Sequence, residues 1–435
     1  MDRKMNPVTV FTFREHQQFS EEEKSTLQSL EITLQGKPEN GEPPKYLGID
    51  ENNASYYIGA SWLTADHAVA VLPKRIDSDD DKIATDFIAM YLEVLQCAPT
   101  AAEYFSKCYD IYFTQPPIEC EVLNEQLTPL LIFHFIFYVQ IILKKGLKKH
   151  YVMREENLQS KVRGRILMQK NLEKNIFTKR LDRTFCKFQE YTVDIPENRL
   201  LKKALLFSAR YFNTYSGLSS HESFKTIKTT MQEMISAFHL VSDTIEIYEI
   251  KNLKRNKMFK EYSEAIRLAK MVLQRFDFSI ANAQLCKRTV PPFWIDMSRL
   301  YEVYVYTQLE KAYPGQIGFQ VSGYQSTALD FIHKSAGVIL DTKYKTRYQN
   351  SNKDMLDDIR QLSGYARDEK ILANFDPAIR DIMRPCVIIY PVIQSGETVA
   401  SFSNDICDVL NDEHKISGFK NFYKISVELP KKTDI

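Results

Sequence analysis

Short runs with the two-residue period of β-strands dominate the first part of the chain, and helical patterns dominate the middle. The early β-type runs are Val8–Phe13, Ser55–Trp62 and Ala68–Leu72. Apolar residues spaced at three and four positions fill much of 211–288 and recur at Asp296–Ala312 and Asn352–Asp368. This order predicts an α+β, multidomain protein: a small β-rich N-terminal domain (1–117), a helical, basic middle region (118–288) and a C-terminal α/β domain (289–435).

The most informative pattern lies near residues 327–344, where two β-type runs flank the polar, Gly-containing segment 333–337. Such a connection between two strands predicts a hairpin turn. If residues 334–337 form a four-residue loop, His333 pairs with Val338. One face of the hairpin then carries apolar side chains that suit burial, namely Leu329, Phe331, Leu340 and Tyr344.

The same register sets Asp330 opposite Asp341, with Cβ atoms roughly 5 Å apart, and turns Lys343 to the same face. Like charges at that distance repel, so the pair requires a shared proton or a bound cation. Mg²⁺ takes oxygen ligands, binds through one or two carboxylates and keeps water and phosphate in its shell. Lys343 beside the metal would orient or deprotonate water and stabilise charge on a phosphate. The pattern indicates metal-assisted phosphodiester hydrolysis, although an Asp…Asp-x-Lys spacing alone also arises by chance.

Two predicted helices flank the hairpin. The first begins near Asp296 and carries Glu302 beside its apolar stripe, where the acid is either a third metal ligand or a solvated helix charge. The second places Gln361 and Tyr365 one turn apart on one face, where they assist the site or form an ordinary helix face.

Composition places the chain among ordinary globular proteins, with 44% hydrophobic and 26% charged residues in 435. Seven scattered cysteines without a Cys-x-x-Cys spacing favour reduced thiols in the cytoplasm over disulfides or a zinc site. The most apolar run, Leu127–Leu143, is short for a membrane span and is interrupted by His134 and Gln140, which favours a buried helix and no membrane association.

Basic residues concentrate in the middle region. Between Lys144 and Arg210 there are 18 Lys and Arg against 7 Asp and Glu, a net charge of 18 − 7 = +11 in a chain whose total is +1. Clustered positive charge raises affinity for phosphate backbones, although solvated helix faces or an acidic partner are alternative explanations. The candidate DNA-binding residues are Arg163, Arg165, Arg199, Lys202 and Lys345.

An apolar strand ending in Asp330, a hairpin, and then Asp341-Thr342-Lys343 resembles the strand pair of the PD-(D/E)xK nuclease superfamily. The Gln-x-x-x-Tyr pair that follows resembles its RecB-like branch. Further segments are similar to McrC proteins, the nuclease subunits of McrBC modification-dependent restriction systems. These segments are Arg163–Ile166, Phe185–Asp194, Pro196–Lys202, Pro292–Glu302 and Ile388–Pro391, and the resemblance covers roughly residues 120 to 435.

The resemblance implies a Mg²⁺-dependent DNA endonuclease in which Asp330, Asp341 and Glu302 hold metal and Lys343, Gln361 and Tyr365 complete the site. It implies docking on an McrB-type AAA+ GTPase hexamer, whose hydrolysis the subunit stimulates, and cleavage of double-stranded DNA with modified cytosine. Order along the chain assigns the docking to residues 1–117. The chain has no Gly-x-x-x-x-Gly-Lys-Ser/Thr sequence, so GTP would be bound by the partner.

Two other functions remain open from the sequence. One is a RecB-like repair or defence nuclease that acts alone, and the other is a non-catalytic regulator of an AAA+ partner. The intact set of two acids and a lysine argues against the regulator, because a scaffold has no physical need for opposed acids.

Overall fold

The computed structural model describes residues 9–30, 48–49, 52–77, 82–84, 86–95, 104, 108–112, 115–214, 222–245, 260–284, 289–324, 327–345, 352–376, 382–392, 402 and 405–430. The chain forms two compact units. Unit 1 combines residues 1–127 with residues 282–435, and unit 2 is residues 128–281.

One five-stranded sheet of unit 1 is built from both ends of the chain. Its strands in spatial order are β1 (Thr9–Arg14), β3 (His67–Leu72), β2 (Tyr57–Trp62), β12 (Phe293–Asp296) and β6 (Tyr109–Ile111). The run predicted from Val8, a residue outside the described ranges, forms β1. The buried Trp294 of β12 packs in one core with Phe13, Val69 and Val71.

This shared sheet corrects the predicted three-domain division at residues 117 and 288. The strand β12 follows the second boundary, yet it pairs antiparallel with both β2 and β6 of the first segment. Backbone hydrogen bonds on both edges of β12 join the two segments into one compact unit. Residues 1–117 are therefore not a separate domain.

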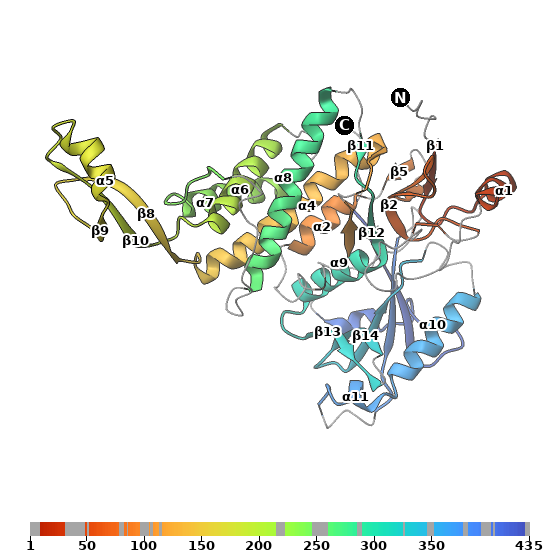
Figure 1. Ribbon diagram of the computed structural model, residues 1–435. Coiled ribbons are helices and arrows are strands. Elements are labelled where there is room, and N and C mark those ends of the chain that lie inside the picture. Colours follow the sequence, from red (N-terminus) through yellow and green to blue (C-terminus); the bar gives the residue numbers. More distant parts are fainter. Residues whose placement is uncertain are drawn as a thin grey trace. The chain divides into compact units, whose positions relative to one another are not determined.

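A second sheet of unit 1 lies wholly in the last third of the chain (Figure 1). Its order is β13 (Ile317–Ser322), β14 (Ala328–His333), β15 (Val338–Thr342), β16 (Cys386–Pro391) and β17 (Phe422–Val427). The first three strands are antiparallel and the last three are parallel. The remaining elements of unit 1 are α1 (Glu21–Ser29), β4 (Arg75–Asp77), β5 (Lys82–Ala84), α2 (Phe87–Leu95), β7 (Ile118–Glu119), β11 (Thr289–Val290), α9 (Met297–Ala312), α10 (Asn352–Tyr365), α11 (Glu369–Leu372) and the 3₁₀ turn η6 (Ile406–Val409).

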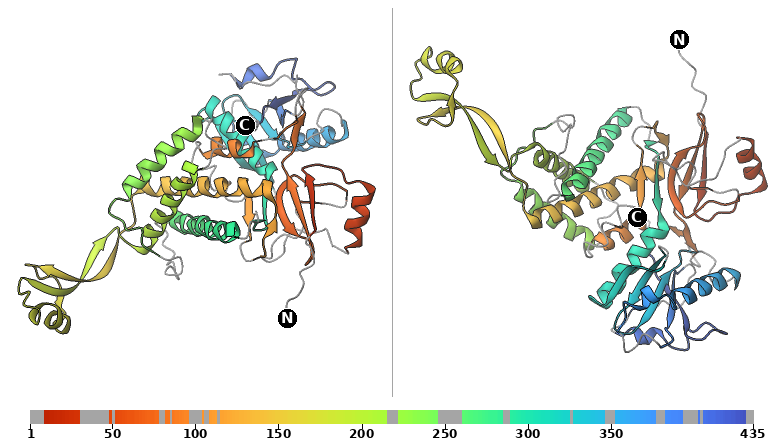
Figure 2. Two further views of the ribbon diagram at one scale, coloured as in Figure 1. Left: turned by 90° about the horizontal axis from the view of Figure 1, so that it is seen from above. Right: turned by 60° about the horizontal axis from the view of Figure 1, so that its bottom comes forward.

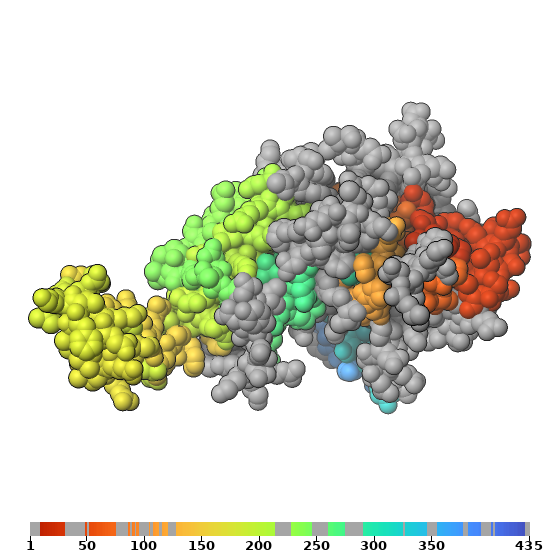
Figure 3. Space-filling view, turned by 45° about the horizontal axis from the view of Figure 1, so that its top comes forward, coloured from red at the N-terminus to blue at the C-terminus, as the bar shows by residue number. Residues whose placement is uncertain are grey.

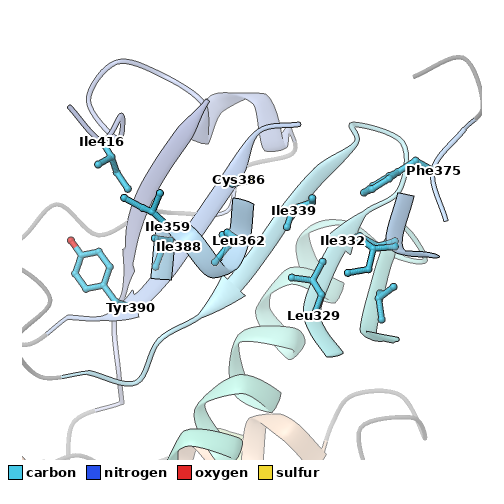
Figure 4. Packing of buried hydrophobic residues seen from close by; sticks show 12 residues of the cluster. Leu329, Ile332, Ile339, Ile359, Leu362, Phe375, Cys386, Ile388, Tyr390 and Ile416 are labelled. Carbon is cyan, nitrogen blue, oxygen red and sulfur yellow. The ribbon is translucent and has the colours of Figure 1, made fainter. Parts of the chain in front are cut away.

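Helices pack on the two faces of this sheet. Tyr306 of α9 stacks on Phe319 and Phe331, at ring-centroid distances of 4.5 and 6.3 Å. Ile332, the next residue of the strand, belongs to the core cluster that also holds Ile359 of α10 (Figure 4). Because neighbouring strand residues face opposite ways, α9 and α10 cover opposite faces. Both helices begin and end close to their predicted bounds, and the Asp296 side chain caps α9 by accepting from the Arg299 N–H at 3.0 Å.

The described residues of unit 2 form four long helices: α4 (Glu121–Lys145, which begins in unit 1), α6 (Pro196–Thr214), α7 (Glu222–Ala237) and α8 (Lys260–Gln284, which ends in unit 1). By length and mean hydropathy, residues 128–145 of α4 would suit a membrane span, but 61% of that stretch is buried inside the protein. Ile132, Phe133 and Phe135 have no exposed surface. The predicted buried helix is confirmed, and His134 is a fully buried residue whose pKa is lowered to about 3 by burial.

The prediction that the middle region is helical is wrong for residues 150–192. A long antiparallel arm forms there from β8 (His150–Gln159) and β10 (Arg183–Thr192), joined by β9 (Arg165–Ile166), the short helix α5 (Met168–Asn171) and the π-helical turn η1 (Leu172–Ile176). The arm extends from the helices of its unit in both views of Figure 2. Figure 3 shows the arm in yellow. Its side chains include Phe177 and Leu181, which are 74% and 80% exposed.

Candidate active site

The predicted hairpin is present between β14 and β15. His333 pairs with Val338, and the four residues between them form the turn. Gly337 has a φ of 66°, a left-handed backbone conformation that glycine adopts without steric cost. The regular ladder ends at the pair Phe331–Leu340, directly before the two acids.

Asp330 is held against β15 by Thr342. The Thr342 N–H donates to Asp330 Oδ2 at 2.7 Å, and the Thr342 hydroxyl donates to the same oxygen at 2.5 Å. These two bonds fix one carboxyl oxygen of Asp330 at the end of β15 where Asp341 lies.

Asp341 and Lys343 lie two residues apart on one strand face and form an ion pair between Oδ2 and Nζ. Asp341 is almost wholly buried, with 2% of its surface exposed. Its Oδ2 accepts no hydrogen bond of good geometry from the described residues. Lys343 Nζ also donates to Gln361 Oε1 at 2.9 Å and lies 4.0 Å from Asp358 Oδ1.

Glu302 of α9 is buried, with 7% of its surface exposed, so the alternative of a solvated helix charge is wrong. The Tyr104 hydroxyl donates to Glu302 Oε2 at 2.8 Å, and the Gln320 side-chain amide donates to Oε1. Gln320 has a φ of 50° within β13, a backbone conformation that is uncommon for a non-glycine residue. Both partners of this carboxyl group are uncharged.

Burial raises the pKa of Glu302, Asp330 and Asp341, each to about 7. Desolvation is the largest cause in all three. The acids also act on one another, since Glu302 raises the pKa of Asp330 and Asp330 raises that of Asp341. The three groups therefore form one electrostatic cluster that a bound cation would relieve.

The chemistry of the cluster fits Mg²⁺, which binds through one or two carboxylates and retains water ligands. Asp341 is a buried carboxylate whose Oδ2 contacts the Lys343 ammonium, and the charge of Asp330 acts on it directly. Within the described ranges, no group of three or more His, Cys, Asp or Glu side chains is arranged to hold a metal by itself. The residues present therefore fit a magnesium ion held mainly by Asp330 and Asp341 and completed by water.

Gln361 and Tyr365 form one hydrogen-bonded chain that runs from Lys343 to β14. Gln361 Nε2 donates to the Tyr365 hydroxyl at 3.0 Å, and that hydroxyl donates to the Ala328 carbonyl at 3.0 Å. Gln361 therefore fixes the Lys343 ammonium from α10, while Tyr365 fixes Gln361.

Sequence reasoning missed Asp358, which lies three residues before Gln361 on the same helix and is 5% exposed. Its carboxylate accepts from Lys345 Nζ at 2.9 and 2.8 Å, and it lies within ion-pair distance of Lys343. The i,i+3 spacing from Gln361 was the available signal, because that spacing places both side chains on one helix face.

The five candidate DNA-binding residues are divided between the two units. Lys345 belongs to unit 1 and is paired with Asp358, whereas the other four belong to unit 2. Arg199 of α6 makes two hydrogen bonds of 2.7 Å to Asp194, and Lys202 donates to a backbone carbonyl. These two side chains stabilise unit 2 internally.

The other two candidates lie on the arm. The Arg163 guanidinium stacks 4.5 Å from the Phe188 ring centroid and pairs with Glu190 at 3.4 Å. Arg165, in β9, is exposed.

The site consists of buried acids and a lysine at the end of a hairpin in a mixed sheet, and a sequence comparison identifies the family of the chain. The chain belongs to the family described as McrBC 5-methylcytosine restriction system component, whose model matches residues 53–371. No curated protein sequence matches the chain.

Two solved structures from Thermococcus gammatolerans are similar to this chain. One is described as a refined half-complex from a tetradecameric assembly of McrB AAA+ hexamers with bound McrC. Its match has 16% identity and a TM-score of 0.39, and covers 97% of this chain and 94% of that chain. The other is described as a cryo-EM structure of the McrBC complex, with 15% identity, a TM-score of 0.31, and coverage of 70% of this chain and 88% of that chain. Both likenesses are distant.

Proposed function

We propose that this chain is the Mg²⁺-dependent nuclease subunit of a McrBC-type restriction system and that its C-terminal sheet is a PD-(D/E)xK nuclease core. The observation that carries the proposal is the meeting of Asp330, Asp341 and Lys343 at the end of one hairpin, next to Glu302. Membership of a restriction-system family supports the choice of DNA as substrate.

Asp330 and Asp341 would hold the metal, with Glu302 of α9 as a further acid. Bound there, Mg²⁺ supplies a Lewis acid that polarises a phosphate oxygen and an attacking water. The family's restriction function makes double-stranded DNA with modified cytosine the expected substrate.

Lys343 acts as a cation in this site. Burial lowers its pKa, but the carboxylates of Asp341 and Asp358 oppose that effect and leave the pKa above its usual value. A charged ammonium orients water and stabilises negative charge on a phosphate, and it cannot accept a proton. The raised pKa therefore favours a Lys343 that orients the attacking water and stabilises charge on the phosphate over a Lys343 that deprotonates the water.

The partner in this proposal is an McrB-type AAA+ GTPase hexamer that binds and hydrolyses GTP. The chain lacks the Gly-x-x-x-x-Gly-Lys-Ser/Thr sequence that cradles nucleotide phosphates, so GTP hydrolysis belongs to the partner. The docking predicted for residues 1–117 remains part of this proposal, and the exposed apolar side chains of Phe177 and Leu181 on the arm are further candidate contacts with the partner.

The test is cleavage of methylated DNA by the purified chain with its partner, GTP and Mg²⁺. We expect Asp341→Ala or Lys343→Ala to abolish cleavage and to leave partner binding and GTPase stimulation intact. Asp357→Ala is the matched control, because Asp357 is an acid of α10 with a 61% exposed side chain. Cleavage that survives both substitutions contradicts the assignment, and cleavage of plain DNA by the chain alone indicates a nuclease that needs no partner.

A further inference from the structure

The residue after the site lysine, Tyr344, is buried although it follows the last paired residue of β15. It is 5% exposed and packs against Tyr301 of α9 at a centroid distance of 5.5 Å. Tyr344 is the central residue of a tight turn in which the Lys345 N–H donates to the Lys343 carbonyl at 2.9 Å, so its buried ring anchors the backbone directly after Lys343.

Two residues from the N-terminal part of the chain reach this tyrosine. Lys74 Nζ lies 3.8 Å from the centroid of the Tyr344 ring, and the Lys74 N–H donates to Glu15 Oε1 at 2.9 Å. Both charged residues are buried, with 5% and 4% of their surfaces exposed. An ammonium over an aromatic face gains an electrostatic attraction that strengthens when water is excluded.

Burying the charges of this lysine and glutamate costs free energy unless other interactions compensate for the lost water. Burial lowers the pKa of Lys74 to about 8, and the attraction of Glu15 opposes that shift. Within the described part of the chain, Lys74 Nζ has no hydrogen-bond acceptor, so its charge is stabilised by the Tyr344 ring and by the attraction of the Glu15 carboxylate.

The backbone at Lys343 is thereby held from two sides. The Lys343 N–H donates to the Ile389 carbonyl of β16 at 2.8 Å, and Lys345 is paired with Asp358 of α10. Of these restraints, the contact of Lys74 with the Tyr344 ring is the one that involves a residue outside the last third of the chain.

We propose that Glu15 and Lys74 are positioning residues for Lys343 and act by clamping the Tyr344 ring. The inference rests on the proposed nuclease function and extends it. The segments that follow β1 and β3 then support the position of Lys343 through this buried contact, independently of any surface that they offer to a partner.

Four variants test the clamp. Tyr344→Leu removes the ring, Tyr344→Phe keeps it, and the double variant Glu15→Gln/Lys74→Met removes both buried charges at nearly constant volume. Tyr313→Leu is the matched control, since Tyr313 is 3% exposed and packs on His333 at the opposite end of the same hairpin.

The first readout is steady-state DNA cleavage with the partner, GTP and Mg²⁺. We expect Tyr344→Leu and the double variant each to lower kcat by about ten- to a hundredfold with KM for DNA unchanged, because a small misplacement of a catalytic group costs that much. Tyr344→Phe and Tyr313→Leu should stay close to wild type. Combining Tyr344→Leu with the double variant should lower kcat no further, because all three residues act through one contact.

The second readout is hydrogen exchange of the peptide 340–345, which requires no activity. We expect faster exchange in Tyr344→Leu and in the double variant, and unchanged exchange in Tyr344→Phe. Unchanged exchange in all variants overturns the clamp, as does an equal loss of kcat in Tyr313→Leu. Faster exchange with full activity also overturns it, because the contact would then be structural only. A wild-type protein that does not cleave contradicts the proposed function instead, and the exchange data still decide whether the clamp exists.

Discussion

At the scale of single residues, the site is governed by the cost of keeping three acids away from water. Glu302, Asp330 and Asp341 are drawn from a helix and two strands, and their shared environment raises the pKa of each to about 7. Of these three acids, Asp341 alone has a cationic neighbour at ion-pair distance among the described residues, namely Lys343. These shifts predict that the stability of the protein depends on pH and, if the proposed magnesium site is correct, on metal.

The sign of that dependence follows from proton binding. An acid whose pKa is about 4 in the unfolded chain and about 7 in the folded chain keeps its proton to a higher pH when the chain is folded. Its contribution to stability is therefore complete below about pH 4 and is lost as the pH rises through about 7. We expect the free energy of unfolding of metal-free protein to fall by a few kcal/mol (about 1.4 kcal/mol per pKa unit) across that window.

Mg²⁺ should reverse this loss, because in the proposed site it would bind the ionised acids. Thermal unfolding at pH 5 and pH 7.5 with and without Mg²⁺ measures the effect, and the metal should raise Tm mainly at pH 7.5. Asp341→Asn should reduce both the pH dependence and the metal effect. A Tm that Mg²⁺ raises equally at both pH values contradicts the acid cluster as the metal site.

At the scale of elements, close backbone approach decides where strands can pair. Gly59 of β2 pairs with Trp294 of β12 and has a φ of 147°. A Cβ atom at Gly59 would lie 2.0 Å from the Phe293 carbonyl oxygen, which belongs to the backbone and cannot rotate away. The junction between the two ends of the chain therefore requires glycine at this position.

We predict that Gly59→Ala lowers stability by at least about 3 kcal/mol, because the β2–β12 pairing must separate to admit the methyl group. Thermal unfolding followed by circular dichroism measures the change. Gly364→Ala is the control, since Gly364 lies in α10 with open space around the added carbon. That substitution should raise stability by about 0.5–1 kcal/mol through helix propensity, and equal effects of the two variants would contradict the explanation.

At the scale of the whole molecule, one compact unit is formed by two segments that are far apart in the sequence, residues 1–127 and residues 282–435. Residues 282–435 contain the site, but β12 obtains both of its strand partners from residues 1–127. The buried side chains of β12, including Trp294 at 1% exposure, lose their cover without those partners.

We predict that a fragment of residues 282–435 fails to fold alone and that co-expression with residues 1–127 gives a soluble complex. Gel filtration and near-ultraviolet circular dichroism distinguish these outcomes. The fragment 128–281 serves as the control, because it corresponds to a compact unit and should fold by itself. A folded, monodisperse 282–435 fragment would instead support the division predicted from the sequence.

The sequence determined those features that depend on local chemistry. The turn residues at 334–337 set the pairing of His333 with Val338, and the periodic apolar residues and the Asp296 cap set the position of α9. Strand alternation then gave the common face of Asp341 and Lys343, because that relation depends only on residues two apart.

Only the tertiary structure decided the features that depend on contacts distant in sequence. The pairing of β12 with β2 and β6, the burial of Glu302 between Tyr104 and Gln320, and the contact of Lys74 with Tyr344 join residues from both ends of the chain. Strand order within a sheet and the partner of a buried charge are set by packing of the whole unit. A local pattern carries no information about either.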